Sequence, residues 1–224
     1  MIALEPDRAY RLWAPTYDNE TAISLIENDL AEELSPPVAG ERLLDAGCGT
    51  GRRLERVQAA LAVGIDRCRE MLMARGEPRV AVADVRALPV PSDFFDVIWC
   101  RLVLGHIDDP LPAYRELARV CRPGGRLFVS DFHADAVAAG HSRSFRDESG
   151  QLHAVEHHVH DTDSHLQAAR EAGFAATERR DGTIGDRVRH LYVRAGRDAQ
   201  YKTDFGLPVV ASFLFVRAVD APAD

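Results

Sequence analysis

The ten residues from Leu43 to Arg52 constrain the fold of this chain more than any other feature. They read LLDAGCGTGR, an apolar run that ends in an acid and is followed by Gly47, Gly49 and Gly51. Glycine has no Cβ, so a turn built from glycines can bend sharply and let its backbone approach a ligand closely. An apolar strand that leads into such a turn is typical of a nucleoside site at the carboxyl edge of a parallel sheet.

Short apolar runs alternate with helical stretches along most of the chain. We predict strands at 42–46, 62–66, 79–84, 95–100, 126–131, 174–180 and 207–218. One or two helices are expected within 8–34, and further helices at 51–60, 67–75, 110–121 and 162–172. This alternation favours a parallel α/β sheet, whose strands are buried on both faces and therefore apolar throughout. A hairpin is expected around residues 148–150, and no element is predicted for residues 183–204.

Three acids, Asp45, Asp66 and Asp84, each end one of these apolar runs. Asp66 lies 19 residues after Gly47, which places it at the tip of the neighbouring strand, where it can accept hydrogen bonds from both ribose hydroxyls. Asp84 is expected one strand further on, where it can accept from an adenine amino group while the Val85 N–H donates to a ring nitrogen. Asp45 is placed to meet a cationic ammonium near the glycine turn.

Other nucleotide sites fit less well. A nicotinamide dinucleotide site requires G-x-G-x-x-G, but the third glycine, Gly51, comes one position early and Arg52 follows it. A short-chain reductase would need a tyrosine four residues before its lysine, and the only lysine, Lys202, has Asp198 there. The chain also lacks the Gly-Lys-Ser/Thr of a P-loop.

Composition limits the partners. The chain has 224 residues, a net charge of -8 and no basic tail, which argues against a nucleic-acid partner. It has no apolar run of about 18 residues, so no membrane span is expected. The start of the chain does not resemble a signal peptide, and the four cysteines form no C-x-x-C pair. These features predict a reduced, cytoplasmic setting.

Several segments, in order and spacing, resemble the motifs of the class I S-adenosylmethionine-dependent methyltransferases. The similarity extends to the small-molecule branch that includes the ubiquinone and menaquinone biosynthesis methyltransferases. The segments that carry it are Ala14–Asp18, Leu43–Gly51, Gly64–Asp66, Ala83–Val85 with Leu88–Pro89, Phe94–Ile98 and Pro123–Leu127.

The resemblance implies a Rossmann-like, doubly wound sheet of seven mostly parallel strands with an antiparallel last strand. It also implies S-adenosyl-L-methionine as cofactor, with Asp45 near its ammonium, Met71 against its adenine and the segment around Tyr17 folded over it. The residues predicted to bind the cofactor are Tyr17, Asp45, Gly47, Cys48, Gly49, Gly51, Arg52, Asp66, Arg67, Met71, Asp84, Val85, Arg86, Cys100, Arg101 and His106.

The segment after the fourth strand indicates the kind of acceptor. Enzymes that methylate exocyclic amines of nucleobases carry an Asn/Asp-Pro-Pro-Tyr motif there, whereas this chain has CRLVLGHI at 100–107. A small-molecule acceptor is therefore expected, methylated on O, N or C. Because histidine titrates near neutral pH, His106 and His133 are the candidate catalytic bases.

We predict one methyltransferase domain over residues 1–224. It comprises an N-terminal helical cover (1–40), a cofactor-binding core (41–131), a lid or acceptor insertion (132–160) and the C-terminal part of the sheet (161–224). Two alternatives stay open: a silent cofactor-binding partner subunit, and a metal enzyme that uses His158 and His160 with His133 or His153. No metal ligand is assigned.

Overall fold

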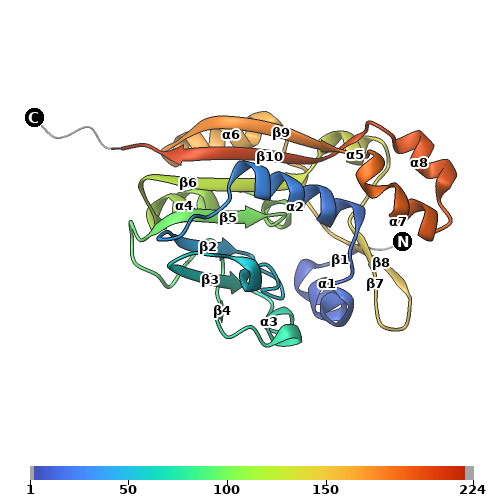
Figure 1. Cartoon of the computed structure of the whole chain (residues 1–224), viewed down its shortest axis with the longest axis horizontal. Helices are drawn as coiled ribbons and strands as arrows, with labels where there is room; N and C mark the ends of the chain where they lie inside the picture. The colour runs from blue at the N-terminus through green and yellow to red at the C-terminus, as the bar shows by residue number, and fades with distance from the viewer. Residues whose placement is uncertain (1–2, 220–224) are drawn as a thin grey trace, which may run out of the picture.

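The computed structural model describes residues 3–219, and its centre is a seven-stranded sheet in the order β4-β3-β2-β5-β6-β10-β9 (Figure 1). The strands are β2 (Arg42–Ala46), β3 (Leu61–Asp66), β4 (Val80–Val82), β5 (Phe95–Arg101), β6 (Cys121–Phe132), β9 (Phe174–Thr183) and β10 (Pro208–Arg217). The strands from β4 to β6 are parallel, and β10 is antiparallel to both of its neighbours. The predicted α/β sheet with an antiparallel last strand is confirmed.

Helices cover both faces of this sheet. In Figure 1, α2 (Ala22–Leu34) crosses in front, and α4 (Leu111–Val120) and α6 (Thr162–Glu171) lie behind. Helix α2 begins with a capping box in which Thr21 and Ser24 exchange side-chain-to-backbone hydrogen bonds of 2.9 and 3.0 Å. The stretch 8–34, predicted to form one or two helices, corresponds to two, α1 (Pro6–Trp13) and α2.

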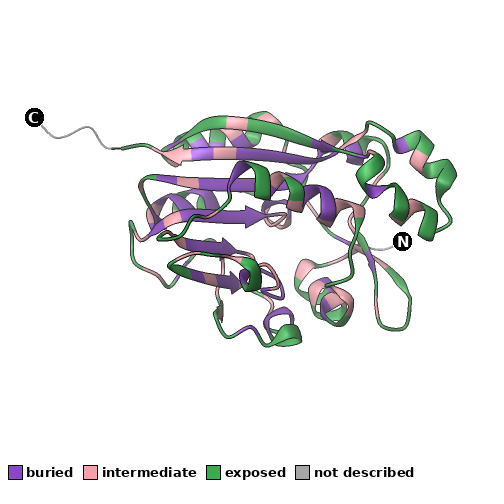
Figure 2. Cartoon of the chain, in the orientation of Figure 1, coloured by how far each residue is buried: buried purple, intermediate pink, exposed green. Residues whose placement is uncertain are grey.

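The strand side chains alternate between two apolar layers. Leu44, Ile98 and Leu127 face the layer that contains α4 and α6, whereas Leu43 and Val97 face α2. All five are completely buried, and Figure 2 shows the central strands almost entirely in the buried colour. Burial on both faces explains why these strands are continuous apolar runs in the sequence.

One predicted helix is wrong. Residues 51–60 form only a single 3-10 turn, η2 (Leu54–Arg56), after which Val57 is extended. A helix of these ten residues would rise about 15 Å, roughly the length of the five-residue strand β2. Because β3 begins at Leu61, no residue would then remain for the turn into that strand. Instead, the Ala60 N–H donates to Glu41 O and Leu61 enters β3 beside Arg42.

The carboxyl ends of the parallel strands point toward α1 and the chain after β6, whereas β10 runs the opposite way (Figure 1). Helix α3 (Arg69–Arg75) follows β3 there. The predicted hairpin is present as β7 (Ser144–Arg146) and β8 (Leu152–Val155), and β1 (Ala3–Leu4) pairs with β8 in a second, three-stranded sheet. This three-stranded sheet was not predicted from the sequence. Three short helices were not predicted either: α5 (Ala134–Ala138), α7 (Arg189–Arg194) and α8 (Asp198–Asp204). The remaining 3-10 turns are η1 (Ala14–Thr16), η3 (Leu104–His106) and η4 (Asp186–Val188).

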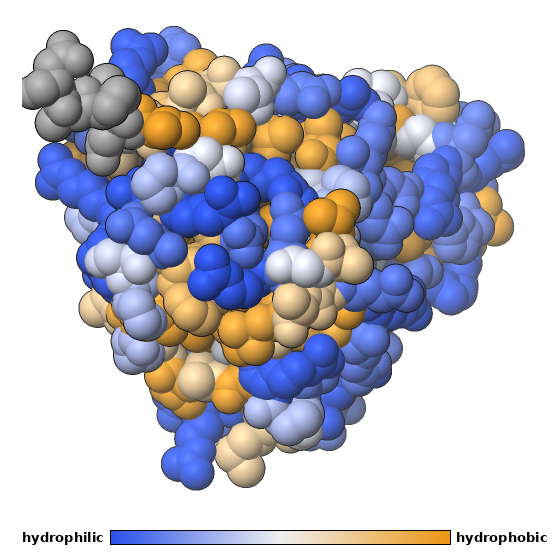
Figure 3. Space-filling model, turned by 60° about the vertical axis from the view of Figure 1, so that its left-hand side comes forward, coloured by the Kyte–Doolittle hydropathy of each residue, from blue (hydrophilic) through white to orange (hydrophobic). Residues whose placement is uncertain are grey.

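Two further observations concern the surface. On the face drawn in Figure 3, hydrophobic residues lie among hydrophilic ones. Within residues 3–219, no helix combines the length and the apolar character that crossing a membrane would require.

Candidate functional site

A cavity of about 420 Å³ lies at the carboxyl edge of the sheet. Its walls come from the turn after β2, the tips of β3 and β5, helix α3 and, on the opposite side, α1. The residues that line it are Glu5, Pro6, Asp7, Tyr10, Tyr17, Gly47, Gly49, Ile65, Asp66, Arg67, Cys68, Met71, Ala83, Asp84, Val85, Arg86, Arg101, Leu102, Val103, His106 and Ile107. Eleven of the sixteen residues predicted to bind a cofactor therefore meet in one place.

The glycine turn forms part of the cavity wall, and two of its residues could not carry a side chain. Gly47 has a φ of +81°, and a Cβ there would lie 2.2 Å from Val103 Cγ2. Gly49 has a φ of +60°, and a Cβ there would lie 3.2 Å from both Met71 Cε and Tyr17 Cε1. The turn thus needs glycine for its backbone conformation and for its close packing.

Asp66 joins the tip of β3 to this turn. Its carboxylate accepts 2.8 Å hydrogen bonds from the backbone N–H groups of Gly49 and Cys68. Burial raises the pKa of Asp66 from 3.8 to about 6, although these two hydrogen bonds act in the opposite direction. The side chain is therefore a fixed acceptor that faces the cavity.

Asp84 lies at the same edge, one strand further on, but its carboxylate already has a partner. The Arg86 guanidinium donates to both oxygens, at 2.9 and 2.6 Å, and the hydrogen bonds to Arg86 hold the pKa of Asp84 below its usual value. A ligand amino group would share or replace this guanidinium. Met71, which is 1% exposed, packs against the wall between the two acids and the turn.

Asp45 is fully buried below the turn and does not line the cavity. Neither carboxylate oxygen has a hydrogen-bond partner among the described residues. Burial raises the pKa of Asp45, and the positive charges of Arg53 and Arg101 oppose that rise. An unpartnered buried carboxylate attracts a cation. This agrees with the cationic ammonium that the sequence predicts near Asp45.

Arg101 lines the cavity and is held from behind by α2. Its guanidinium makes two 2.7 Å hydrogen bonds to Glu27, which also accepts from Ser130 at 2.9 Å and from Arg53 at 3.3 Å. Burial alone would raise the pKa of Glu27, but the charges of Arg101 and Arg53 lower it to about 2. Glu27 therefore remains ionised and neutralises two arginines beneath the turn.

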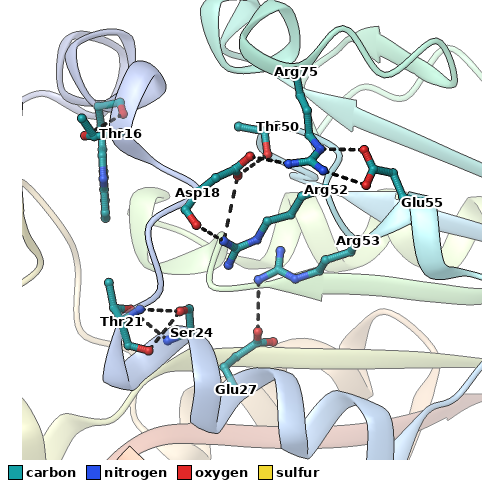
Figure 4. A network of polar contacts seen from close by, with 11 residues as sticks. Thr16, Asp18, Thr21, Ser24, Glu27, Thr50, Arg52, Arg53, Glu55 and Arg75 are labelled. Carbon is teal, nitrogen blue, oxygen red and sulfur yellow. Dashed lines mark hydrogen bonds and ion pairs between the residues drawn. The ribbon is translucent and has the colours of Figure 1, made fainter. Parts of the chain in front are cut away.

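A second network fastens the N-terminal segment to the glycine turn (Figure 4). The Asp18 carboxylate accepts from Thr50 Oγ1 at 2.7 Å and from Arg75 Nη1 at 2.9 Å, and the Asp18 carbonyl accepts from Arg52 at 3.1 Å. Arg75 also pairs with Glu55 through two 2.7 Å hydrogen bonds. These contacts hold Tyr17 over Gly49. Arg52 thus helps to hold the N-terminal segment in place and does not line the cavity.

At the opposite end, which we call the histidine end, the wall consists of Tyr10, Leu102, Val103, His106 and Ile107. The Tyr10 hydroxyl lies 2.8 Å from His106 Nε2. Burial, followed by the charge of Arg143, lowers the pKa of His106 to about 3. His106 is therefore a neutral imidazole at physiological pH.

His133 lies elsewhere. It caps the start of α5, where its Nδ1 accepts from the Asp135 N–H at 3.1 Å, and its Nε2 is 3.6 Å from an Asp181 oxygen. It does not line the cavity, so the structure gives this candidate base no contact with a ligand there.

The other predicted residues outside the cavity are structural neighbours of it. Cys48 and Cys100 are 1% and 0% exposed. Burial raises the pKa of both thiols far above the usual value, so both remain protonated. Gly51 packs against Glu77 and Val80.

Several lining residues were not predicted from the sequence, above all Tyr10, Val103 and Asp7. Tyr10 stacks on Trp13 with ring centroids 5.6 Å apart. The Asp7 carboxylate accepts a 2.6 Å hydrogen bond from Arg67 at the tip of β3. The only signal in the sequence was the aromatic residues of the N-terminal segment, which suit either a core or a cover.

The histidines do not form a metal site in the part of the chain that the structure describes. No group of three His, Cys, Asp or Glu side chains there is arranged to hold an ion. His158 and His160 stack, with ring centroids 6.4 Å apart. His153 pairs with Asp147 at 2.7 Å and His160 with the Ile107 carbonyl at 2.8 Å.

Known proteins share these features. Residues 44–129 match the family model described as a methyltransferase domain. The chain is 31% identical over 183 residues to a ubiquinone biosynthesis O-methyltransferase from Ralstonia nicotianae, which covers 75% of each protein. It is 38% identical over 127 residues to a 27-O-demethylrifamycin SV methyltransferase from Amycolatopsis mediterranei, over 50% of this chain and only 46% of that relative.

A crystal structure of an S-adenosylmethionine-dependent methyltransferase from Mesorhizobium loti superimposes with a TM-score of 0.66. It is 22% identical and covers 86% of this chain and 98% of its own, so it supports the fold. The strand order, the glycine turn with its acids, the matched family model and the 31% identity lead to one conclusion: the chain belongs to the class I S-adenosylmethionine-dependent methyltransferases.

Proposed function

We propose that this protein transfers a methyl group from S-adenosyl-L-methionine to an oxygen atom of a small-molecule acceptor. The observation that carries the proposal is the cavity in which Gly47 and Gly49 of the turn lie beside the fixed carboxylate of Asp66. The choice of oxygen rests on the names of the two curated relatives, both of which denote O-methylation.

The residues fit this cofactor. Asp66 is the proposed acceptor for the ribose hydroxyls, and Asp84 with Val85 the proposed contacts of the adenine. Asp45, buried without a partner, would attract the methionine ammonium across the turn. Cys48, Gly51, Arg52 and Cys100 are proposed to support the site from outside it.

When bound, the cofactor supplies a methyl group that is already activated by a positively charged sulfur. The protein then has to orient the acceptor and keep water out. Tyr10 and Tyr17 are placed for the second task because both line the cavity from the N-terminal cover. The pairing of β1 with β8 joins that cover to the chain after β6.

We propose that residues 1–224 act as one domain, with 1–40 as cover, 41–131 as cofactor core, 132–160 as the acceptor insertion and 161–224 completing the sheet. The unpaired state of Cys48, Cys68, Cys100 and Cys121 supports a reducing, cytoplasmic setting. The net charge of -8 supports a small-molecule acceptor over a nucleic acid.

Two measurements test the proposal. Calorimetry should detect binding of both S-adenosylmethionine and S-adenosylhomocysteine. Incubation with a panel of phenols, hydroxyquinones and aliphatic alcohols, followed by mass spectrometry, should find a product that has gained one methyl group on oxygen. Binding with no product from any acceptor would favour the silent partner subunit, and absence of binding would refute both.

A further inference from the structure

One buried arginine, Arg143, joins three separate segments at the histidine end. Its side chain is 10% exposed and comes from the chain just before β7. Nη1 donates to the Leu102 carbonyl at 2.8 Å, lies 2.6 Å from His106 Nε2 and is 3.5 Å from the Tyr10 hydroxyl. The insertion, the loop after β5 and helix α1 therefore meet at a single guanidinium.

These contacts fix the protonation of the imidazole. A guanidinium can only donate hydrogen bonds, so the Nε2 that faces Arg143 carries no proton. The other ring nitrogen, Nδ1, lies 3.4 Å from the Glu156 carbonyl, which can only accept. His106 is thus a neutral Nδ1–H tautomer, and the lone pair on its Nε2 is already shared between Arg143 and the Tyr10 hydroxyl.

The charges around His106 favour the same state. Arg143 and His157 oppose a positive charge on His106, and Asp131 is the one group among them that favours it. Asp131 lies 3.5 Å from Arg143 Nη2 and 3.6 Å from His165 Nε2. Burial would raise the pKa of Asp131, but the contacts with His165 and Arg143 lower it overall. Its negative charge therefore compensates the guanidinium.

Arg143 also supports an unusual backbone. Leu102 has a φ of +59°, a left-handed conformation that is uncommon for a residue with a branched side chain. The Leu102 N–H donates to Ser130 O at 2.8 Å and its carbonyl accepts from Arg143. Leu102, in the wall of the histidine end, is thus held through both its N–H and its carbonyl.

We propose that Arg143 is a positioning residue for methyl transfer: it holds His106 neutral, so that His106 orients the Tyr10 hydroxyl over the cavity and does not act as a general base. The kinetic part of this inference rests on the proposed function, whereas the tautomer of His106 can be measured without any reaction. Tyr10 and His106 line the cavity, so a ligand would touch these two side chains and not Arg143.

Nuclear magnetic resonance of protein with ¹⁵N-labelled histidine tests the tautomer, with the His106 signals assigned by His106→Asn. In the unaltered protein, His106 should show one protonated and one unprotonated ring nitrogen without change from about pH 5 to about pH 8. Arg143→Met should raise the pH at which His106 takes up a proton, although burial, the larger cause, still opposes its charge, and Arg143→Lys, which keeps a charge and a donor, should raise it much less. Titration of His106 near its ordinary pKa in the unaltered protein would overturn the inference, even if Arg143→Met failed to fold.

Arg146→Met is the matched control. Arg146 lies three residues further on, in β7, is exposed, and its guanidinium donates only to the Gly150 carbonyl in the hairpin. This variant should leave both the His106 signals and the kinetics unchanged.

The kinetic readout separates positioning from base catalysis. Arg143→Met should lower kcat by roughly tenfold or more, with KM for S-adenosylmethionine changed less than about twofold, because the cofactor end of the cavity is untouched. A fall in the rate at low pH, an acid limb of the pH–rate profile caused by protonation of His106, should appear only in this variant. Such a limb in the unaltered protein would instead identify His106 as the base. If no acceptor is turned over, the resonance titration still decides the inference.

Discussion

The carboxylate of Asp66 accepts a hydrogen bond from the Gly49 N–H at 2.8 Å, so the tip of β3 and the glycine turn form one rigid unit. Hydrogen bonds from the Gly47 and Cys48 N–H groups to the Ile65 carbonyl also hold the turn against β3, and the turn in its place orients the acid. A ligand that contacts the glycine turn therefore also contacts the Asp66 carboxylate.

Replacing Asp66 with Asn should weaken the binding of S-adenosylhomocysteine by about 1–3 kcal/mol, because charge-assisted hydrogen bonds to the ribose are lost. Calorimetry measures this directly. Asp163→Asn, an exposed substitution in α6, should change nothing. Equal affinity for the Asp66 variant and the unaltered protein would remove the ribose assignment.

The pKa of Asp66 also predicts how binding depends on pH. Ribose hydroxyls bind the ionised carboxylate, so affinity should weaken as pH falls below about 6. The stability of the free protein should change in the opposite sense. The folded state holds the Asp66 proton more tightly than the unfolded chain, so this stabilisation is complete below pH 3.8 and is lost as pH rises to about 6. In Asp66→Asn the pH dependence of binding should be much flatter.

Gly47→Ala should abolish cofactor binding, because the new Cβ would overlap Val103 Cγ2 in addition to straining a backbone at φ +81°. Gly150→Ala is the matched control: its φ is +83°, but no atom lies within 4 Å of the added Cβ. Cofactor affinity and thermal unfolding, measured for both variants, should distinguish the effect of the steric overlap with Val103 from the effect of backbone strain. Similar losses in both would show that the packing against Val103 is unimportant.

Glu27→Gln should destabilise the fold by roughly 3–5 kcal/mol, because two buried arginines lose their common counter-charge. Urea unfolding measures the loss, and Glu32→Gln, exposed in the same helix, provides the reference. Because the folded pKa of Glu27 is lowered to about 2, its contribution should be present above about pH 4.5 and disappear as pH falls toward 2. A variant as stable as the Glu32 control would contradict this account.

Asp18→Asn should loosen the cover and weaken cofactor binding only a few-fold, since partly exposed pairs contribute about 0.2–1 kcal/mol each. The effect should shrink in high salt, where such pairs are screened. Asp29→Asn breaks a comparable surface pair, with Arg187, that lies away from the cavity and should leave affinity unchanged. An equal loss in both variants would count against a cover held by Asp18.

His133→Asn should keep methyl transfer within about twofold of the unaltered protein, because asparagine is also a good helix N-cap and the ring lies outside the cavity. Initial rates with one accepted substrate provide the measurement. A loss of a hundredfold or more would restore His133 as a catalytic candidate.

The parts of the molecule that could be predicted are those with local causes. Apolar runs such as Phe95–Arg101 are buried on both faces, so they identify their own strands. Likewise, Asp66 follows its strand directly, so the topology alone brings it to Gly49. The elements that were missed or predicted wrongly have non-local causes. The two residues of β1 are too few to show a pattern, and a helix at 51–60 would leave no residue for the turn into β3, which begins at Leu61.

Arg143 shows the same limit within the site. It lies 37 positions from His106, in a polar stretch with no periodic pattern, and meets it only because β6 and the hairpin return the chain to this edge. Nothing in the sequence distinguishes Arg143 from the exposed Arg146. The tautomer that we propose for His106 depends on this one tertiary contact.

The parallel pairing of Ala3 with Ala154 has a consequence for the order of assembly. This two-residue strand closes a loop of 151 positions, and few hydrogen bonds offset the entropy of that closure. Its amides should therefore exchange with deuterium long before those of β5, even in the intact fold. Saturating the protein with S-adenosylhomocysteine should slow that exchange, so the first strand of the chain can report whether the cavity is filled.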